Sequence, residues 1–420
     1  MRLAVRLVFP LAAWALGCSA PPDPGLGGRT SPPESPDAGP PLPTVMLPGT
    51  TQPSSAPGMC TSWSSTVLDL SSLPASRSTF VHGVDGGFSV VAATESPARV
   101  AALALDRAGA PRAAEVDLPV ESAAVADAIA TSEGGWLAAW TTGSSEYYAC
   151  TGALSFVHYD AVGTPTGQTP SQTGGAGLLG AEPGGATDVA WCNSDPSWSS
   201  QLGTVSALPF GLSQGASFAT GVAESFLGWR RGTLLSLECT ASGSCDYGYG
   251  GAVLRTWNSS GQPVLGAVLP DDLATTMSTG AAVASPGDDP STAIVAQASG
   301  VSFVSASQVL FVPSDVLLNG ASPWPCPPVA GAARAVVGFD GHVGGDGDAG
   351  GNDALQIVEV SAAGGRSVVG VAPLPANPVR NLAESTVTLA ATLAEDAYMV
   401  VLVGTTDIEG AVFTCTGRAS

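Results

Sequence analysis

The chain has 420 residues, of which 45% are hydrophobic and 12% charged, and its 53 glycines and 34 prolines are typical of short strands joined by tight turns. The 35 acidic residues outnumber the 14 basic ones, and the net charge of -21 argues against nucleic acid or an anionic membrane surface as a direct partner. All basic residues are arginine, which excludes lysine-based catalysis, and we interpret the acidic surface as a solubility feature rather than a cation site.

The first residues have the order of an export signal. A positively charged start and an apolar run over 7–16 precede Ala15-Leu16-Gly17-Cys18, which predicts a signal peptide over 1–17. The last four residues resemble the lipobox of bacterial lipoproteins, although Ala15 stands where that family usually has leucine. The resemblance implies a diacylated Cys18 that anchors the chain to the lipid bilayer, and Ser19 is similar to the residue that favours the outer membrane. An ordinary signal peptide cleaved nearby is the alternative.

Residues 18–59 combine the lipidated cysteine with a proline-rich stretch that has almost no large apolar side chains. Such a segment cannot bury a core, so we predict a disordered, semi-extended linker. The remaining residues, 60–420, are predicted to form the folded domain.

Within that domain a unit of about fifty residues recurs. Residues 127–170 show it most clearly, with four strand patterns separated by turns, as in one blade of a β-propeller. The second strand of each unit is apolar and is predicted to begin near Phe88, Trp136, Ala186, Leu234, Ser291, Arg334 and Ala397.

A second marker is the turn that follows the third strand. It reads DRAGAP at 106–111, DAVGTP at 160–165 and NSSGQP at 258–263, with a degenerate copy at 361–364. An acid or amide that caps its own turn, followed by a glycine with positive φ, is the chemistry that such a turn requires. The two markers therefore support the same repeat.

The seventh unit ends after its third strand, and residues 66–70 are similar to the fourth strand of the first unit at 115–118. We therefore expect 66–70 to complete the last unit and close the ring. The predicted fold is all-β, a single seven-bladed β-propeller closed by the N-terminal strand, with six to eight blades possible. An open solenoid or two sandwiches are the alternatives. The domain resembles secreted bacterial β-propeller lipoproteins, which implies a fold but no activity.

Seven cysteines remain after Cys18, and disulfides are expected in an exported chain. The predicted pairs are Cys239 with Cys245 across a short loop, Cys60 with Cys415 between the two ends, and Cys150 with Cys192 between neighbouring units. Cys326 is left over. Buried free thiols are the alternative.

The connections between second and third strands emerge on one face of a propeller, and four of them are long. We predict that this face binds a glycan, peptide or protein ligand, because rigid aromatic residues beside acids suit recognition. Freely varying surface loops are the alternative. The candidate ligand-binding residues are Tyr147, Tyr148, Asp195, Trp198, Asp246, Tyr247, Tyr249 and His342.

Residues 346–353 resemble the start of an EF-hand calcium loop, with Asp346, Asp348, Asn352 and Asp353 as candidate ligands. Ile357 stands where that loop has glutamate, so a flexible hairpin tip without metal is the alternative, and no cofactor other than calcium is expected. Gly211-Leu212-Ser213-Gln214-Gly215 matches a hydrolase motif but lacks its strand-to-helix context. His82 and His158 are predicted to be hydrogen-bonded structural residues.

The leading functional hypothesis is a monomeric binding or scaffold lipoprotein of the cell envelope with no catalytic residues. The alternative is a propeller enzyme that cleaves polysaccharide with paired carboxylates near the central axis. For that alternative, Asp85 and Glu182 are the candidates in the first strands of their units.

Overall fold

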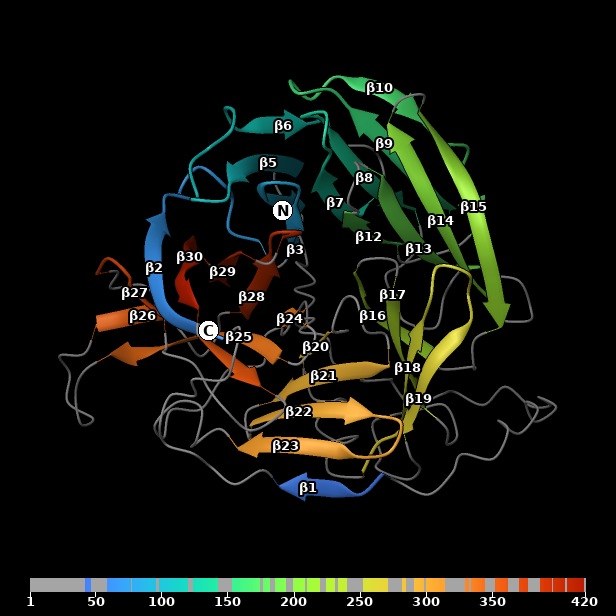
Figure 1. Cartoon of the computed structure of the whole chain (residues 1–420). Helices are drawn as coiled ribbons and strands as arrows, with labels where there is room; N and C mark the ends of the chain where they lie inside the picture. Colours follow the sequence, from blue (N-terminus) through green and yellow to red (C-terminus); the bar gives the residue numbers. More distant parts are fainter. Residues whose placement is uncertain are drawn as a thin grey trace, which may run out of the picture.

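The computed structural model describes residues 42–46, 59–76, 78–95, 98–119, 124–142, 153–173, 177–181, 186–193, 199–207, 210–219, 224–230, 233–239, 252–270, 282–284, 291–297, 300–313, 329–331, 334–343, 352–361, 370–376, 386–394, 396–404 and 406–418. In these ranges every regular element is a β-strand, and the strands form seven sheets around a common centre (Figure 1). The chain therefore has an all-β β-propeller fold.

Apart from the outer strands that sheets 5 and 7 take from residues 44–46 and 60–68, each sheet is an antiparallel meander whose first strand lies nearest the centre (Figure 1). Sheet 1 contains β3 (Ser78–Val84), β4 (Gly87–Glu95), β5 (Ala98–Asp106) and β6 (Val116–Leu118). Sheet 2 contains β7 (Ala124–Ala130), β8 (Trp136–Thr141), β9 (Ala153–Tyr159) and β10 (Pro165–Gln168), and β11 (Gln172–Thr173) also pairs with β9. Sheet 3 contains β12 (Gly177–Ala181), β13 (Thr187–Asn193), β14 (Ser199–Ala207) and β15 (Phe210–Ala219).

The other four sheets repeat this order. Sheet 4 contains β16 (Glu224–Arg230), β17 (Thr233–Cys239), β18 (Ala252–Trp257) and β19 (Pro263–Val268). Sheet 5 contains β20 (Ala282–Ala284), β21 (Thr292–Gln297), β22 (Gly300–Ser305) and β23 (Val309–Pro313), with β1 (Thr44–Met46) added outside β23. Sheet 6 contains β24 (Val329–Gly331), β25 (Arg334–Val343), β26 (Asn352–Ser361) and β27 (Gly370–Pro373). Sheet 7 contains β28 (Thr386–Ala391), β29 (Ala397–Val403), β30 (Ile408–Arg418) and, from the other end of the chain, β2 (Cys60–Leu68).

All seven apolar segments predicted as second strands are the second strands of these sheets. Every residue of β8 and β29 is buried. A strand with one face in solvent alternates between apolar and polar residues, whereas these strands are covered on both faces by neighbouring sheets and read as continuous apolar runs. The repeat was visible in the sequence for this reason.

The hydrophobic core lies between adjacent sheets. One cluster joins sheets 1, 2 and 3 through residues such as Val91, Trp140 and Trp191. Another joins sheets 7 and 1, where Phe88 packs with Met399. Two further clusters join sheet 4 to sheet 5 and sheets 5, 6 and 7 to one another. Burial of these side chains therefore depends on the neighbouring sheet, since a single sheet cannot cover its own apolar faces.

The predicted turns after the third strands adopt the expected conformation. Gly109, Gly163 and Gly261 have φ values of 87°, 82° and 70°. In the first turn the Oδ1 atom of Asp106 accepts the backbone N–H groups of Ala108 and Ala110 at 2.8 and 2.9 Å. Asp160 and Asn258 form the same pair of bonds in the second and third turns. The fourth, degenerate copy lies mostly outside the described residues.

These turns share one end of the sheets with the turns that join first and second strands. In sheet 1 the Nη2 atom of Arg112 donates to the carbonyl oxygen of Asp85 at 2.6 Å, which links the two turns. We call this end of the propeller the short-turn end. The connections between second and third strands leave from the opposite end, which we call the loop end.

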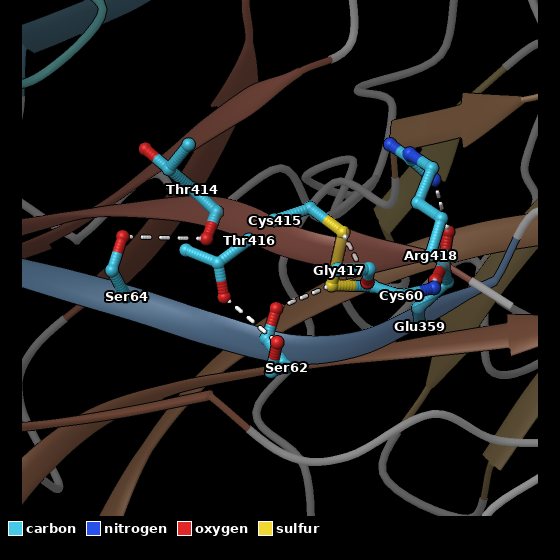
Figure 2. Close-up of a disulfide and its surroundings, with 9 residues drawn as sticks. All are labelled: Cys60, Ser62, Ser64, Glu359, Thr414, Cys415, Thr416, Gly417 and Arg418. Atoms are coloured by element: carbon cyan, nitrogen blue, oxygen red, sulfur yellow. Dashed lines mark hydrogen bonds and ion pairs between the residues drawn. A yellow bond between two sulfur atoms is a disulfide. The ribbon is translucent and has the colours of Figure 1, made fainter.

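The predicted joining of the two chain ends is confirmed. Strand β2 pairs antiparallel with β30, with Thr66 opposite Val412 and Leu68 opposite Gly410. The strand is longer than the predicted segment and begins at Cys60. A disulfide between Cys60 and Cys415 crosses the same pair of strands, as expected from the sequence (Figure 2).

A buried carboxylate from sheet 6 also holds the two ends. Glu359, on β26, is fully buried and accepts the backbone N–H of Cys60 (Figure 2). Its other oxygen lies 3.7 Å from the Nη1 atom of Arg418, near the end of β30. The carboxylate therefore contacts the first residue of β2 and the last residue of β30, and ties both to the neighbouring sheet.

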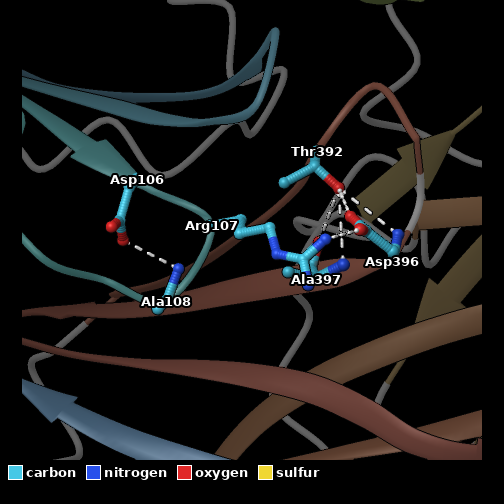
Figure 3. A network of polar contacts seen from close by, with 6 residues as sticks. All are labelled: Asp106, Arg107, Ala108, Thr392, Asp396 and Ala397. Carbon is cyan, nitrogen blue, oxygen red and sulfur yellow. Dashed lines mark hydrogen bonds and ion pairs between the residues drawn. The ribbon is translucent and has the colours of Figure 1, made fainter.

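Sheet 1 contacts sheet 7 through its turn at 106–111. A Cβ atom at Gly109 would lie 2.4 Å from Leu68 Cδ2 and 3.2 Å from Val412 Cγ2, so this turn is seated closely against sheet 7. Beside it, Arg107 donates to Asp396 at 3.0 Å, and the hydroxyl of Thr392 donates to the other oxygen of Asp396 at 2.7 Å (Figure 3). The turn thus combines an apolar contact with a surface ion pair.

One part of the predicted linker is wrong. Residues 42–46 are ordered against the propeller, with β1 parallel to β23, whereas the sequence predicted disorder throughout 18–59. Leu42 packs against the core between sheets 4 and 5, which supplies the apolar contact that a proline-rich segment cannot make with itself. Residues 18–41 and 47–58 lie outside the described residues.

Candidate functional site

The structure describes little of the predicted binding loops. Seven of the eight candidate ligand-binding residues lie outside the described residues, namely Tyr147, Tyr148, Asp195, Trp198, Asp246, Tyr247 and Tyr249. The eighth, His342, is on strand β25, opposite Asp353 of β26, and not in the loop where the sequence placed it. The loop begins later because the β25–β26 ladder extends to Val343 and Asn352. The grouping of these residues stays a prediction.

The structure describes two of the four predicted calcium ligands. Asn352 and Asp353 are the first residues of β26, where they pair with Val343 and His342, and Asp346 and Asp348 lie outside the described residues. The backbone of Asp353 is tied further, because its carbonyl oxygen accepts the N–H of Leu374 at 2.8 Å. Within the part of the chain that the structure describes, no group of three or more His, Cys, Asp or Glu residues could hold a metal ion.

Of the three predicted disulfides, the pair of Cys60 and Cys415 is formed. Cys239 is the last residue of β17 and Cys192 lies on β13, but their predicted partners, Cys245 and Cys150, are outside the described residues. These two pairings stay predictions. Cys18 and Cys326 also lie outside the described ranges.

The described residues bring together a polar cluster on the innermost strands of sheets 1, 2 and 3. The Nε2 atom of His82, on β3, lies 2.6 Å from Asp127 Oδ1, on β7. The same oxygen accepts the backbone N–H of Ala128, and Oδ2 accepts the backbone N–H of Leu179, on β12, both at 2.8 Å. One carboxylate thus joins three sheets close to the centre of the propeller.

Burial and charge act in opposite directions on His82. Burial of the imidazole is the largest single influence and lowers its pKa. The negative charge of Asp127 and the hydrogen bond to it favour the protonated ring, and together they leave the pKa of His82 raised above the ordinary value of 6.5. The side chain of Asp127 is 5% exposed and that of His82 is 20% exposed, so the imidazole is the member of the pair that solvent reaches.

The second histidine has the opposite character. His158, on β9, has its Nδ1 atom within hydrogen-bonding distance of the Thr166 hydroxyl, at 2.5 Å, and its ring lies near Phe210. Burial lowers its pKa, and the charges of Glu133 and Asp160 oppose this shift. The hydrogen-bonded roles predicted for His82 and His158 are therefore both confirmed.

The sequence did not single out Asp127. Its signal was a carboxylate inside an otherwise apolar first strand, AVADAIA at 124–130, but nothing local showed which residue it would meet. The sequence proposed two other acids, Asp85 and Glu182, for the axis of the propeller. Asp85 lies exposed in the β3–β4 turn, at the short-turn end, and Glu182 is outside the described residues.

The geometry of the inner cluster suits structural support better than proton transfer from a carboxyl group. Both oxygens of Asp127 accept hydrogen bonds from backbone N–H groups that are fixed by the strands, and these bonds hold the carboxylate in one orientation. His82 keeps partial solvent access and a fixed orientation. The pair therefore places one partly exposed imidazole beside a fixed, buried carboxylate.

Comparisons with known proteins give no family. No protein-family model and no curated protein matches the chain. Solved structures with similar architecture include the β-propeller domain of the trilobed protease from Pyrococcus furiosus, which is 5% identical with a TM-score of 0.45, and covers 81% of this chain and 96% of its own. Sqt1 from Saccharomyces cerevisiae is 12% identical with a TM-score of 0.41 over 86% and 100% of the two chains. Kuenenia stuttgartiensis hydrazine synthase is 10% identical with a TM-score of 0.40 over 82% and 96%.

The described part of the chain contains no helix that is long and apolar enough to cross a membrane.

Proposed function

We propose that the chain is an exported lipoprotein, anchored in the outer membrane through Cys18, whose propeller is a binding or scaffold module. In this proposal the seven sheets are the seven blades of one closed, monomeric ring. The sequence Ala15-Leu16-Gly17-Cys18 supports the anchor, and the pairing of β2 with β30 supports closure of the ring. The ligand is a glycan, peptide or protein surface that meets the loop end.

The observation that carries the binding role is the difference between the two ends of the sheets. At the short-turn end, capped turns such as 106–111 and 160–165 are tight and seated on the neighbouring sheet. At the loop end, the connections between second and third strands at 142–152 and 240–251 are longer, with 11 and 12 residues, and those at 194–198 and 344–351 have five and eight. These carry seven of the eight predicted ligand-binding residues, and variable loops on a rigid scaffold are where recognition is usually placed.

Asp127 favours binding over polysaccharide cleavage. A glycosidase needs one carboxyl group that can donate a proton and a second that acts as base or nucleophile. The Asp127 carboxylate instead accepts the backbone N–H groups of Leu179 and Ala128 and lies 2.6 Å from His82 Nε2. We therefore place the function in the loops rather than at the axis.

The binding role is tested with the detergent-solubilised full-length chain on panels of glycans and cell-wall fragments, with hydrolysis measured in parallel. Substitution of Tyr147 and Tyr148, or of Tyr247 and Tyr249, by serine should weaken binding at least tenfold if these aromatic residues anchor the ligand. Arg112→Ala, at the short-turn end, is the matched control and should bind like the wild type. Equal binding by all variants, or product formation, would contradict the proposal.

The anchor is tested separately. Cys18→Ser should move the chain from the membrane fraction to the soluble fraction and remove the acyl mass from its N-terminal peptide. A chain that stays soluble with an intact Cys18 would show that the signal peptide is of the ordinary kind.

A further inference from the structure

Strand β1 differs from every other strand of the described propeller. It lies outside β23, beyond the fourth strand of sheet 5, and it runs parallel to its neighbour, with Thr44 opposite Val309 and Met46 opposite Phe311 (Figure 1). All other described strand pairs are antiparallel. Strand β1 is therefore not a member of the repeat but a segment added to a finished sheet.

Two neighbouring sheets hold the segment. The carbonyl oxygen of Pro43 accepts the N–H of Val309 at 3.0 Å, which uses an otherwise open donor on the edge of sheet 5. The N–H of Leu42 donates to the carbonyl oxygen of Val268, the last residue of β19 in sheet 4, at 3.1 Å. The contact thus spans the outer rim from sheet 4 to sheet 5.

Leu42 is the apolar anchor of this contact. Its half-buried side chain packs against a cluster that includes Leu265 of β19, Leu269 just after that strand, and Val309 of β23. Val45, in the same segment, is 42% exposed. The segment therefore presents one side chain to the core and another to solvent. An extended peptide that adds to a sheet edge is recognised in the same way, through some of its side chains and its main-chain hydrogen bonds.

The sequence of the segment suits this mode of binding. Pro43 favours an extended conformation for Leu42, and it has no N–H that would need a partner. A proline-rich peptide is already stiff and extended, so docking orders it at a small loss of conformational entropy.

We propose that the outer edge of β23 is a strand-addition site for an extended, proline-containing apolar peptide, and that residues 42–46 occupy it in cis as a dock for the N-terminal tether. A chain extended at about 3.5 Å per residue reaches at most about 85 Å over residues 18–41, and about 150 Å over 18–59. The dock therefore shortens the tether by almost half and makes it leave the propeller at the rim of sheets 4 and 5. The statement about the tether rests on the proposed anchor at Cys18, whereas the peptide site does not.

Residue-resolved hydrogen exchange of the full chain tests the site, because the amide of Val309 reports the bond to Pro43 directly. Leu42→Thr should raise the exchange rate of that amide about tenfold, as expected for the loss of a half-buried leucine. Val45→Thr introduces the same residue at the solvent-facing position and is the matched control, with exchange like that of the wild type. A synthetic peptide of residues 40–47, added to Leu42→Thr, should restore the protection of Val309.

Three results would overturn the proposal. The first is an equal exchange rate of the Val309 amide in the wild type and in Leu42→Thr, and the second is failure of the peptide at millimolar concentration to restore protection. The third is protection of Val309 that rises with protein concentration as the chain dimerises, because this would place the segment on a second copy. Cys18→Ser separates this proposal from the anchor, since it should release the chain from membranes and leave the amide of Val309 protected.

Discussion

Two joints of the propeller solve the same packing problem with different chemistry. The closing joint comprises sheet 7, where β2 meets β30, and its contact with sheet 1, while an internal joint lies between sheets 1 and 2. In both, a capped turn is seated on the preceding sheet, with Gly109 against Leu68 at the closing joint and Gly163 against Val116 at the internal joint. The same packing of turn on sheet therefore continues across the joint where β2 pairs with β30.

The differences between the joints follow from covalent connection. At the internal joint the backbone itself joins sheet 1 to sheet 2, and the inner strands add the pair of His82 and Asp127. At the closing joint the two strands that meet are 355 residues apart at the disulfide, so nothing in the local chain keeps them together. A disulfide and the buried Glu359 take the place of that connection. The disulfide and Glu359 thus lie where chain entropy most favours separation of the strands.

Removal of the disulfide should have the largest effect on this comparison. The double variant Cys60→Ser and Cys415→Ser should lower the free energy of unfolding by about 4 kcal/mol, because the cross-link restricts a very long loop in the unfolded chain. The measurement is the urea midpoint and slope with the cross-link intact and absent. Ser64→Ala, an exposed hydroxyl that bonds across the same strand pair, is the control and should change stability by less than about 0.5 kcal/mol. A double variant as stable as the control would mean that β-pairing alone closes the ring.

Glycine substitutions test whether the two joints are equivalent. Gly109, Gly163 and Gly134 all have positive φ, but a Cβ atom would meet Leu68 at 2.4 Å in the first and Val116 at 2.7 Å in the second, and no atom within 4 Å in the third. Gly134→Ala should therefore cost about 1 kcal/mol through backbone conformation alone. Gly109→Ala and Gly163→Ala should each cost about 3 kcal/mol, since overpacking adds to that strain.

Thermal or urea unfolding of the three variants gives the comparison directly. Similar values for Gly109→Ala and Gly163→Ala would show that the closing joint uses the internal packing unchanged. A Gly109→Ala variant no less stable than Gly134→Ala would show that the first turn is not seated on sheet 7.

The features that the sequence predicted are those with a local or repeated signal. The second strands were visible because burial on both faces gives a continuous apolar run, as in WLAAWT at 136–141. The turns were visible because Asp106 and Gly109 each have a conformational reason to be there. Closure of the ring was predicted because the seventh unit lacks a fourth strand and residues 66–70 form a strand that belongs to no other unit. That prediction required only the number of strands in each unit.

The features that the sequence missed depend on distant partners. Glu359 stands in the apolar strand β26, and only the fold brings it to Cys60. Asp127 was likewise one polar residue in a first strand until the ring placed it between His82 and Leu179. Strand β1 has three residues and no periodicity, so its proline-rich surroundings predicted a linker. Most of the predicted binding loops lie outside the described residues, and that part of the site stays a prediction.

The pH dependence of the free energy of unfolding distinguishes the internal joint, which contains His82, from the closing joint. Because the folded chain raises the pKa of His82 above 6.5, it binds the proton more tightly than the unfolded chain does. The resulting contribution of His82 to the free energy of unfolding is fully present below pH 6.5 and is lost as the pH rises through the raised pKa. His82→Gln should therefore cost about 1 kcal/mol at low pH, the difference between a charged and a neutral hydrogen bond, and less at high pH.

His158 provides a control of opposite sign. Its pKa is lowered in the folded chain, so protonation of His158 reduces the stability of the fold at low pH. This stability is recovered as the pH rises to 6.5. Urea unfolding between pH 5 and 8.5 should show that His82→Gln and His158→Gln change the slope of stability against pH in opposite directions. Parallel curves for the two variants would exclude the assignment of the pH dependence to the pair of His82 and Asp127.

The ion pair beside the closing joint should have the smallest effect. The side chains of Arg107 and Asp396 are 65% and 41% exposed, and exposed pairs usually contribute less than about 1 kcal/mol. A double-mutant cycle with Arg107→Ala and Asp396→Ala should give a coupling energy below about 0.5 kcal/mol that declines further with added salt. Asp396→Ala alone should cost more than Arg107→Ala, because Asp396 also accepts the hydroxyl of Thr392, which is buried. A coupling above 2 kcal/mol would mean that charge, rather than the seated turn and the disulfide, keeps sheet 1 against sheet 7.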